Sequence, residues 1–160
     1  MPEPQIRPAT LADTESLLEM MEDFNTLERI PWSRGSALPA LQQLLATATL
    51  GAVVLVFEGA SPCGYFVLTW GFDLEWSGRD AFLTELYLRP DARGRGLGGA
   101  VLACAERFAR EHAAGALHLM VRPENTAAVR LYRGAGYEAP PRIFLSKVLE
   151  RGRSSRSDHS

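Results

Sequence analysis

Apolar residues recur along this chain at two different spacings, which separate the predicted helices from the predicted strands. Residues 10–25 open on a capping box, Thr10-Leu11-Ala12-Asp13, and then carry apolar side chains three and four positions apart. This pattern predicts an amphipathic helix. Residues 29–35 break it, and Ser36 is expected to cap a second helix that carries leucines on one side.

Strands are predicted where β-branched and aliphatic residues follow one another without helical spacing. A short extended segment comes first and five longer ones follow: residues 5–8, then 51–57, 65–72, 81–88, 117–121 and 143–149. A hairpin turn at 58–64 and a polar loop at 73–80 join the first three long strands in succession, which predicts antiparallel pairing.

The stretch from Thr84 to Leu102, TELYLRPDARGRGLGGAVL, joins a strand to an apolar-faced helix through a glycine-rich loop. That helix crosses over to the strand at 117–121, so this strand should run parallel to its predecessor. A last helix is predicted at 125–135 and is closed by Gly136. A run of antiparallel strands followed by one parallel crossover indicates an α+β fold.

Composition bounds the class of protein. The 160 residues are 46% hydrophobic and 22% charged, which predicts one soluble domain over residues 1–150 and a polar, disordered tail at 151–160. The net charge of −2 gives no basic field for nucleic acid. Two cysteines and three histidines lack the spacing of a disulfide framework or a metal site. No signal or membrane-spanning pattern is visible, so we expect a cytoplasmic protein with no membrane partner.

The glycine-rich loop predicts a phosphate site. Backbone N–H groups at a helix start have no partner within the helix, and the helix dipole adds positive charge there. Glycines at 94, 96, 98 and 99 would let phosphate oxygens approach the backbone, and Arg93 and Arg95 add full charges. Leu97 is expected to point into the core and fix the loop from below.

Two interpretations of this loop are open. Residues 94–99 satisfy the dinucleotide fingerprint G-x-G-x-x-G, which would indicate a nicotinamide oxidoreductase. The context disfavours it, because antiparallel strands precede the loop and too few residues follow it for several parallel strands.

The other interpretation uses more of the chain. Arg93-x-x-Gly96-x-Gly98 follows a strand, and Asn125-Thr-Ala-Ala-Val-Arg-Leu-Tyr132-Arg-Gly-Ala-Gly136-Tyr137 comes later. Together these motifs resemble the two signatures of the GNAT N-acetyltransferases, and the likeness spans residues 5–149. The resemblance implies a mixed, mostly antiparallel sheet with a splayed parallel central strand pair, flanked by helices. It also implies acetyl-CoA as co-substrate.

The resemblance assigns cofactor contacts to the strand end, the loop and the last helix. It implies that the strand end pairs through its backbone with the cofactor's amide arm. The residues implied are Leu86, Tyr87, Leu88, Arg93, Gly94, Arg95, Gly96, Leu97, Gly98, Gly99, Asn125 and Tyr132.

Two residues are expected to act in catalysis. Tyr132 has a reference pKa near 10, close enough to that of a thiol, about 8.5, to protonate a thiolate. Glu85 lies just before the cofactor strand, where it could take the amine's proton or anchor the substrate. Each also has a structural reading: Tyr132 as a core side chain, and Glu85 as a hydrogen-bond partner.

An acidic loop before that strand has two readings as well. Asp73, Glu75 and Asp80, with Trp76 among them, could attract a cationic amine or could be ordinary solvated residues. His118 is expected to be a buried or edge residue rather than a catalytic one.

The function that follows is acetyl transfer to a primary amine of a small molecule or peptide. Direct attack in a ternary complex is expected, because no Cys or Ser has the setting of a nucleophile. The alternative is a non-catalytic acyl-CoA-binding module on the same fold. Which amine is acetylated stays open, and although members of the resembled family often dimerise, no feature here decides it.

Overall fold

One five-stranded sheet, in the order β1-β2-β3-β4-β5, organises the computed structural model, which describes residues 3–149. The strands are β1 (Gln5–Pro8), β2 (Gly51–Glu58), β3 (Ser61–Asp73), β4 (Gly78–Leu88) and β5 (Leu117–Leu119). The helices are α1 (Thr14–Leu27), α2 (Arg34–Ala46), α3 (Leu97–Glu111) and α4 (Thr126–Gly134), with short 3-10 turns at Leu11–Asp13, Leu74–Trp76 and Pro90–Ala92. The strands pair antiparallel except β4 and β5, which pair parallel, so the predicted α+β architecture with its mixed sheet is confirmed.

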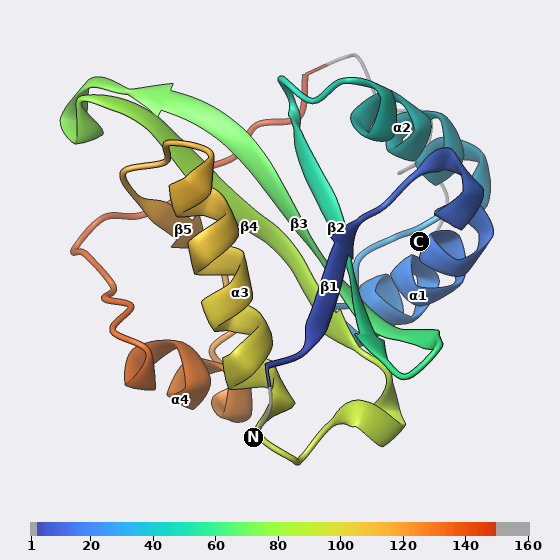
Figure 1. Ribbon diagram of the computed structural model, residues 1–160. Helices are drawn as coiled ribbons and strands as arrows, with labels where there is room; N and C mark the ends of the chain where they lie inside the picture. Colours follow the sequence, from blue (N-terminus) through green and yellow to red (C-terminus); the bar gives the residue numbers. More distant parts are fainter. Residues whose placement is uncertain (1–2, 150–160) are drawn as a thin grey trace, which may run out of the picture.

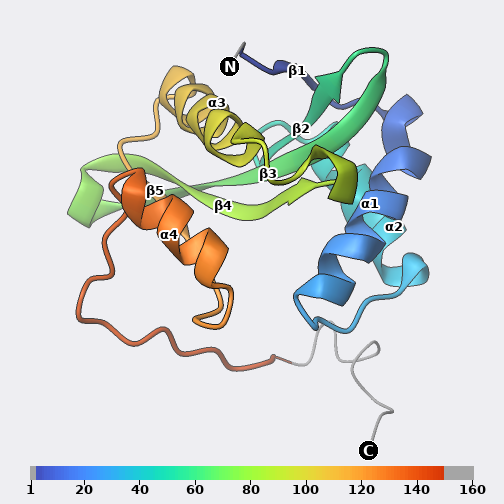
Figure 2. The same ribbon diagram turned by 90° about the horizontal axis from the view of Figure 1, so that it is seen from below.

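Helices cover both faces of the sheet and divide the core into two clusters (Figures 1 and 2). α3 packs on one face, where Val101 and Leu102 meet Phe66 and Leu68 of β3. α1 and α2 pack on the opposite face, where Leu17 of α1 belongs to the second cluster. α4 leans on the first turn of α3 through Leu131, which brings the two predicted signature segments together.

A β-bulge in β4 decides which of its side chains face each helical layer. Leu83 pairs with Leu68 but Glu85 pairs with Val67, so Thr84 is an extra residue in β4. Before the bulge Leu83 belongs to the α3 cluster, and after it Leu86 packs there instead of Glu85. The bulge therefore turns Glu85 and Tyr87 toward the α1 and α2 layer.

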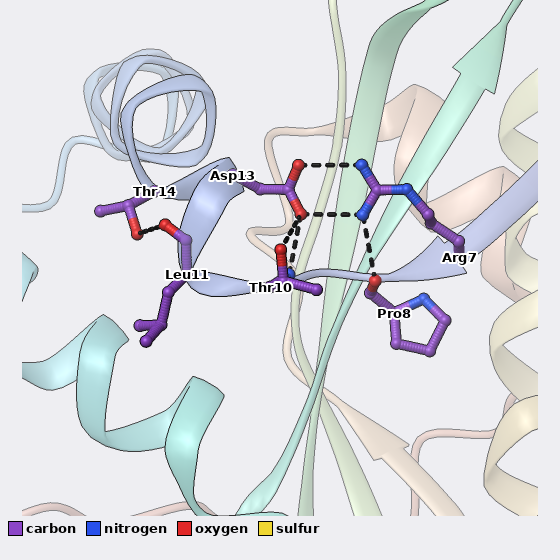
Figure 3. A network of polar contacts seen from close by, with 6 residues as sticks. All are labelled: Arg7, Pro8, Thr10, Leu11, Asp13 and Thr14. Atoms are coloured by element: carbon purple, nitrogen blue, oxygen red, sulfur yellow. Dashed lines mark hydrogen bonds and ion pairs between the residues drawn. The ribbon is translucent and has the colours of Figure 1, made fainter.

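A polar network fixes the entry into α1 (Figure 3). Arg7 donates from its two terminal nitrogens to the two carboxylate oxygens of Asp13, at 2.8 and 2.9 Å. The backbone N–H of Thr10 donates to Oδ2 of Asp13 at 2.7 Å, which confirms the predicted capping box. The Arg7 guanidinium is the main cause that lowers the pKa of Asp13 to about 2.

The cap of α2 was predicted at the wrong serine. The helix begins at Arg34, and the side chain of Ser33 accepts from the backbone N–H of Ser36 at 3.3 Å. A capping residue must be extended and bonds three residues ahead, and Ser33 has that backbone conformation. Ser36 is thus the third residue of the helix rather than its cap.

The predicted last strand, residues 143–149, is wrong within the described part of the chain. This segment takes no strand structure, and Ile143 and Leu145 are 85% and 86% exposed. The β-propensity of a residue reflects how well its side chain fits a half-buried, pleated sheet surface. No strand pairs with this segment, so it has no such surface to join. The predicted polar loop at 73–80 is also shorter, because β4 already begins at Gly78. The predicted tail at 151–160 lies outside the described residues.

Candidate functional site

β4 and β5 separate at their carboxyl ends and leave an open strand edge. β5 pairs with β4 only at Leu117–Leu119, opposite Ala81–Leu83. Among residues 3–149, no strand continues the ladder beyond Leu83 on that side of β4. The backbone of Leu86–Leu88 therefore has no strand partner on that edge, as expected of a splayed strand pair, and the carbonyl of Leu88 accepts from the Arg93 side chain instead.

A cleft of about 430 Å³ opens beside this edge. Its walls are the last turn of α1, the segment Leu86–Leu88, Arg93, and the residues before α4: Arg122, Glu124 and Asn125. Three segments that are distant in the sequence thus meet at the end of β4.

The glycine loop lies next to this cleft and starts α3. Gly94 and Gly96 have φ values of 76° and 78°, a left-handed conformation in which a side chain is strained. Gly96 is the N-cap of α3, so the first amides of the helix have no side-chain partner at the cap. Leu97 is 4% exposed and belongs to the α3 core cluster, so it fixes the loop from below as predicted.

The other two glycines lie at a contact between two helices, and their role at the phosphates stays a prediction. A Cβ on Gly98 or Gly99 would meet Leu131 of α4 at 3.5 or 3.6 Å, an ordinary packing distance. Both residues therefore lie where α3 packs on α4. The backbone conformation of the loop itself requires only Gly94 and Gly96.

The two arginines of the loop point to different places. Arg93 donates from Nε to the carbonyl of Leu88 at 2.8 Å, and its guanidinium lies 5.5 Å from the ring centre of Tyr87. Arg95 instead donates to Glu58 of β2 at 2.6 Å and to the carbonyl of Asp91. Arg93 therefore lines the cleft, whereas Arg95 is engaged with the β2–β3 hairpin.

Asn125 and Tyr132 come from α4. Asn125 caps the helix, because its Oδ1 accepts from the backbone N–H of Ala128 at 3.2 Å, and it also lines the cleft. Tyr132 packs partly buried against the α3 cluster, with the ring of Tyr137 at 5.8 Å.

The hydroxyl of Tyr132 differs from those of the other tyrosines. Tyr65, Tyr87 and Tyr137 each donate to a carboxylate, on Glu85, Asp23 and Glu106 respectively. Tyr132 is the remaining tyrosine of the four, and within residues 3–149 its hydroxyl donates to no carboxylate. Burial, and then the negative charge of Glu28, raise the pKa of Tyr132, so it is a protonated phenol at neutral pH.

Glu85 does not line the cleft. Its Oε1 accepts a hydrogen bond from the fully buried Tyr65 at 2.8 Å, on the α1 and α2 side of β4. Burial raises the pKa of Glu85, and the bond from Tyr65 opposes that rise. Glu85 thus has the structural role of a hydrogen-bond partner that the sequence left open. Its raised pKa also suits a proton acceptor.

The acidic residues at the far end of β4 are all engaged within the protein. Asp73 accepts from the backbone N–H of Glu75, and Glu75 pairs with Arg142 at 2.8 Å. Asp80 is 6% exposed and lies 3.0 Å from Nε2 of His118, a partly buried residue on edge strand β5. These contacts favour a structural role for the three acidic residues over a free site that binds a cationic amine.

The sequence interpretation missed Glu28. This residue follows α1 directly, and its side chain lines the cleft and lies 3.7 Å from Nε of Arg122. No local pattern marks it, because its partner in space, Arg122, comes from the distant segment before α4.

Comparisons with known proteins agree with this geometry. A family model described as "Acetyltransferase (GNAT) family" matches residues 17–137. The chain is 30% identical over 81 residues to thialysine N-epsilon-acetyltransferase of Bos taurus, covering 49% of this chain and 47% of that protein. It is 32% identical over 78 residues to streptothricin acetyltransferase of Streptomyces lavendulae, covering 49% of this chain and 40% of that protein. Each match thus spans less than half of the relative's length.

Likeness to solved structures extends over nearly the whole chain. The Integron Cassette Protein HFX_CASS3, from the mobile metagenome of Cole Harbour Salt Marsh, superposes with a TM-score of 0.80. The two are 31% identical, with 91% of this chain and 90% of that chain covered. No helix within residues 3–149 is long and apolar enough to cross a membrane. The matched family model, with both signatures placed beside the splayed strands, shows that the chain belongs to the GNAT acetyltransferase family.

Proposed function

We propose that this protein is an acetyl-CoA-dependent N-acetyltransferase that acts on a primary amine of a small molecule or peptide. One observation carries the proposal: the open edge of β4 beyond Leu83 lies beside the glycine-started end of α3. The amide arm of acetyl-CoA would pair with the open edge of β4, and its pyrophosphate would bind the free amides at the start of α3.

The residues present fit this co-substrate. The first amides of α3, after Gly96, suit its phosphates, and Arg93 adds a charge beside them. The backbone of Leu86–Leu88 suits the amide arm, and Asn125 lines the same cleft. Arg95 can join them only by leaving Glu58, so its predicted contact depends on a side-chain rearrangement. Acetyl-CoA would supply the acetyl group as a thioester.

Proton transfer is assigned to two residues. Tyr132 would give the proton of its hydroxyl to the departing thiolate, and that hydroxyl is the one tyrosine hydroxyl without a carboxylate partner in the described chain. Glu85 would take a proton from the amine through water, since it lies one residue before Leu86 and its pKa is raised by burial. A backbone N–H near Leu86 would polarise the thioester carbonyl.

Direct attack of the amine is supported by the state of the cysteines. Cys63 and Cys104 are both buried, and burial raises the pKa of each thiol. A thiol in that setting is a poor nucleophile, which disfavours a covalent acetyl-enzyme. The relatives named for thialysine and streptothricin acetylation support a small amine as the acceptor.

Thermal melting in parallel with acetyl-CoA, CoA, NADH and NADPH tests the cofactor. Ligands that bind only the folded state raise its melting temperature, so we expect a rise of several degrees with the CoA compounds alone. A rise with the nicotinamide cofactors and none with CoA would overturn the proposal. Thiol release with a panel of amines then separates an enzyme from a non-catalytic acyl-CoA-binding module, which would bind CoA and release none.

A further inference from the structure

Lys147 is the single lysine of this chain, and the other sixteen basic residues are arginines. A lysine amine becomes a nucleophile once it has lost a proton, whereas the guanidinium of arginine keeps its charge in proteins. Lys147 is therefore the one side chain of the protein that acetyl transfer to a primary amine can modify.

Lys147 lies in a segment that belongs to no helix or strand. Residues 143–149 are exposed, and Figure 2 shows the chain after α4 as an extended trace. Among residues 3–149 the Lys147 side chain has no hydrogen-bond or ion-pair partner, and the nearest one along the chain belongs to Arg142. The lysine and its neighbouring backbone can therefore enter a cleft without opening any element of the fold.

This segment is anchored next to the proposed general acid. The backbone N–H of Tyr137 donates to the carbonyl of Tyr132 at 3.0 Å, and the two ring centres lie 5.8 Å apart. The Tyr137 hydroxyl donates to Glu106 of α3 at 3.1 Å, which ties the start of the segment to the fold. Lys147 follows Tyr137 by ten positions, and ten extended residues span at most about 33 to 36 Å. The tether is thus long enough to bring the Lys147 amine to Tyr132.

One exposed ion pair restrains the tether. Arg142 donates to Glu75 at 2.8 Å, and the two side chains are 69% and 42% exposed. Lys147 is not part of the cleft lining while this pair is formed. An exposed pair contributes little to stability, so the tether is readily released from Glu75.

A tethered amine has two advantages over a free one at this cleft. Short flexible linkers give effective concentrations in the millimolar range. Apolar side chains also flank the lysine, at Leu145 and Val148. The cleft has apolar walls of its own, provided by Phe24, Leu27 and Leu86. Packing of the flanking side chains on these walls would favour reaction within one chain.

We propose that Lys147 is a self-acetylation site, modified by the cleft of its own chain. This inference rests on the proposed acetyltransferase function. The neutral amine nitrogen of Lys147 forms a bond to the carbonyl carbon of the thioester, and the carbon–sulfur bond breaks. The proton of the amine passes through water to Glu85, and the thiolate takes the proton of Tyr132. The products are CoA and an acetyl-lysine at position 147, which has lost its charge.

The competing interpretation is an ordinary solvated lysine, which acetyl-CoA would modify slowly and without help from the fold. The test starts from full-length chain that carries no acetyl group, isolated by ion exchange because acetylation removes one positive charge. This chain is incubated with acetyl-CoA and no added amine, and its acetylation is followed by intact mass and by peptide mass spectrometry.

The matched variant is Lys147→Arg, which keeps the positive charge and removes the amine. Two further samples measure acetylation that does not use the cleft: the wild type unfolded in urea, and the folded wild type with excess CoA. Thiol release with an added amine is measured in parallel for both proteins, and Lys147→Arg should match the wild type there.

We expect one acetyl group per wild-type chain, in the peptide that contains Lys147, and none in Lys147→Arg. The first-order rate constant should exceed that of the unfolded chain at least about tenfold, fall with excess CoA and stay constant when the protein is diluted. Modification of Lys147→Arg to the same extent, a rate equal to that of the unfolded chain, no effect of excess CoA, or a rate constant that falls in proportion to dilution would each contradict the proposal.

The parallel assay separates the two levels of inference. Thiol release with an added amine, while Lys147 stays unmodified, would overturn self-acetylation alone. Failure of the wild type to bind CoA would instead overturn the proposed function itself, and self-acetylation with it.

Discussion

The hydroxyl of Tyr65 lies 2.8 Å from Oε1 of Glu85, and this bond joins two side chains that both lie beneath α1 and α2. Tyr65 is fully buried, and burial together with the charge of Glu85 raises the pKa of Tyr65. The phenol is therefore a permanent donor. Glu85 consequently has one oxygen fixed by Tyr65, and its pKa is set by burial, which raises it, and by this bond, which opposes the rise.

Replacing Tyr65 with Phe should change both stability and the pH dependence of activity. The bond from Tyr65 is what lowers the pKa of Glu85 against the effect of burial, so its loss should raise that pKa further. The acid limb of the kcat/KM profile should then move to higher pH. Leaving a buried carboxylate without its donor should cost about 1–3 kcal/mol of unfolding free energy, measured by urea denaturation.

Glu85→Gln provides the control for that shift. Because the folded-state pKa of Glu85 is raised above 4.5, its ionisation destabilises the fold, and its contribution to stability falls as the pH rises from about 4.5 through the folded value. The Gln variant should lose this fall, and its kcat/KM profile should lose the acid limb. An acid limb that survives in Glu85→Gln would assign the base to another group.

The outline of this fold could be predicted because its signals are local. Helical spacing marked α1 and α3, and the glycines at 94 and 96 marked the loop that they form. The phosphate site could be predicted from the same loop, because free amides at the start of a helix depend only on residues adjacent in the sequence.

What could not be predicted depends on contacts between distant segments. The bulge at Thr84 reverses the facing of Glu85, and only the pairing of β3 with β4 produces it. Glu28 meets Arg122 because the end of α1 and the segment before α4 both line the cleft, and no spacing in the sequence encodes that meeting. Residues 143–149 have the composition of a strand but no ladder, which composition alone does not reveal.

Tyr132→Phe should lower turnover while leaving cofactor binding nearly intact. The change removes only the hydroxyl, and general acids contribute a factor of about 10² to 10⁴ in rate. We expect kcat to fall at least about 10²-fold, with a Kd for CoA within a factor of about two, by steady-state kinetics and calorimetry. The matched control is Tyr137→Phe, whose hydroxyl already donates to Glu106. Equal turnover in the two variants would remove the acid role from Tyr132.

Two glycine substitutions should separate backbone conformation from packing. Gly96→Ala places a side chain at a φ of 78°, which costs roughly 1–2 kcal/mol, and it distorts the first amides of α3. Gly98→Ala adds a methyl group 3.5 Å from Leu131 within a helix, where it fits. Calorimetry with CoA should show weaker binding for Gly96→Ala and near wild-type binding for Gly98→Ala. The reverse order would place the phosphate contact at the second glycine pair.

Asp13→Asn should lower the free energy of unfolding at neutral pH, and this effect should disappear in acid. The variant keeps an oxygen for the backbone of Thr10 but loses the charge that pairs with Arg7, so we expect a loss of about 1 kcal/mol. Because the folded-state pKa of Asp13 is lowered to about 2 from 3.8, the ionised form stabilises the fold, and that contribution is lost as the pH falls through this window. Urea unfolding of both proteins at pH 6, 4 and 3 should therefore show a gap that narrows at the lower values. A gap that stays constant with pH would mean that packing, and not the Arg7 charge, is what the wild-type carboxylate provides.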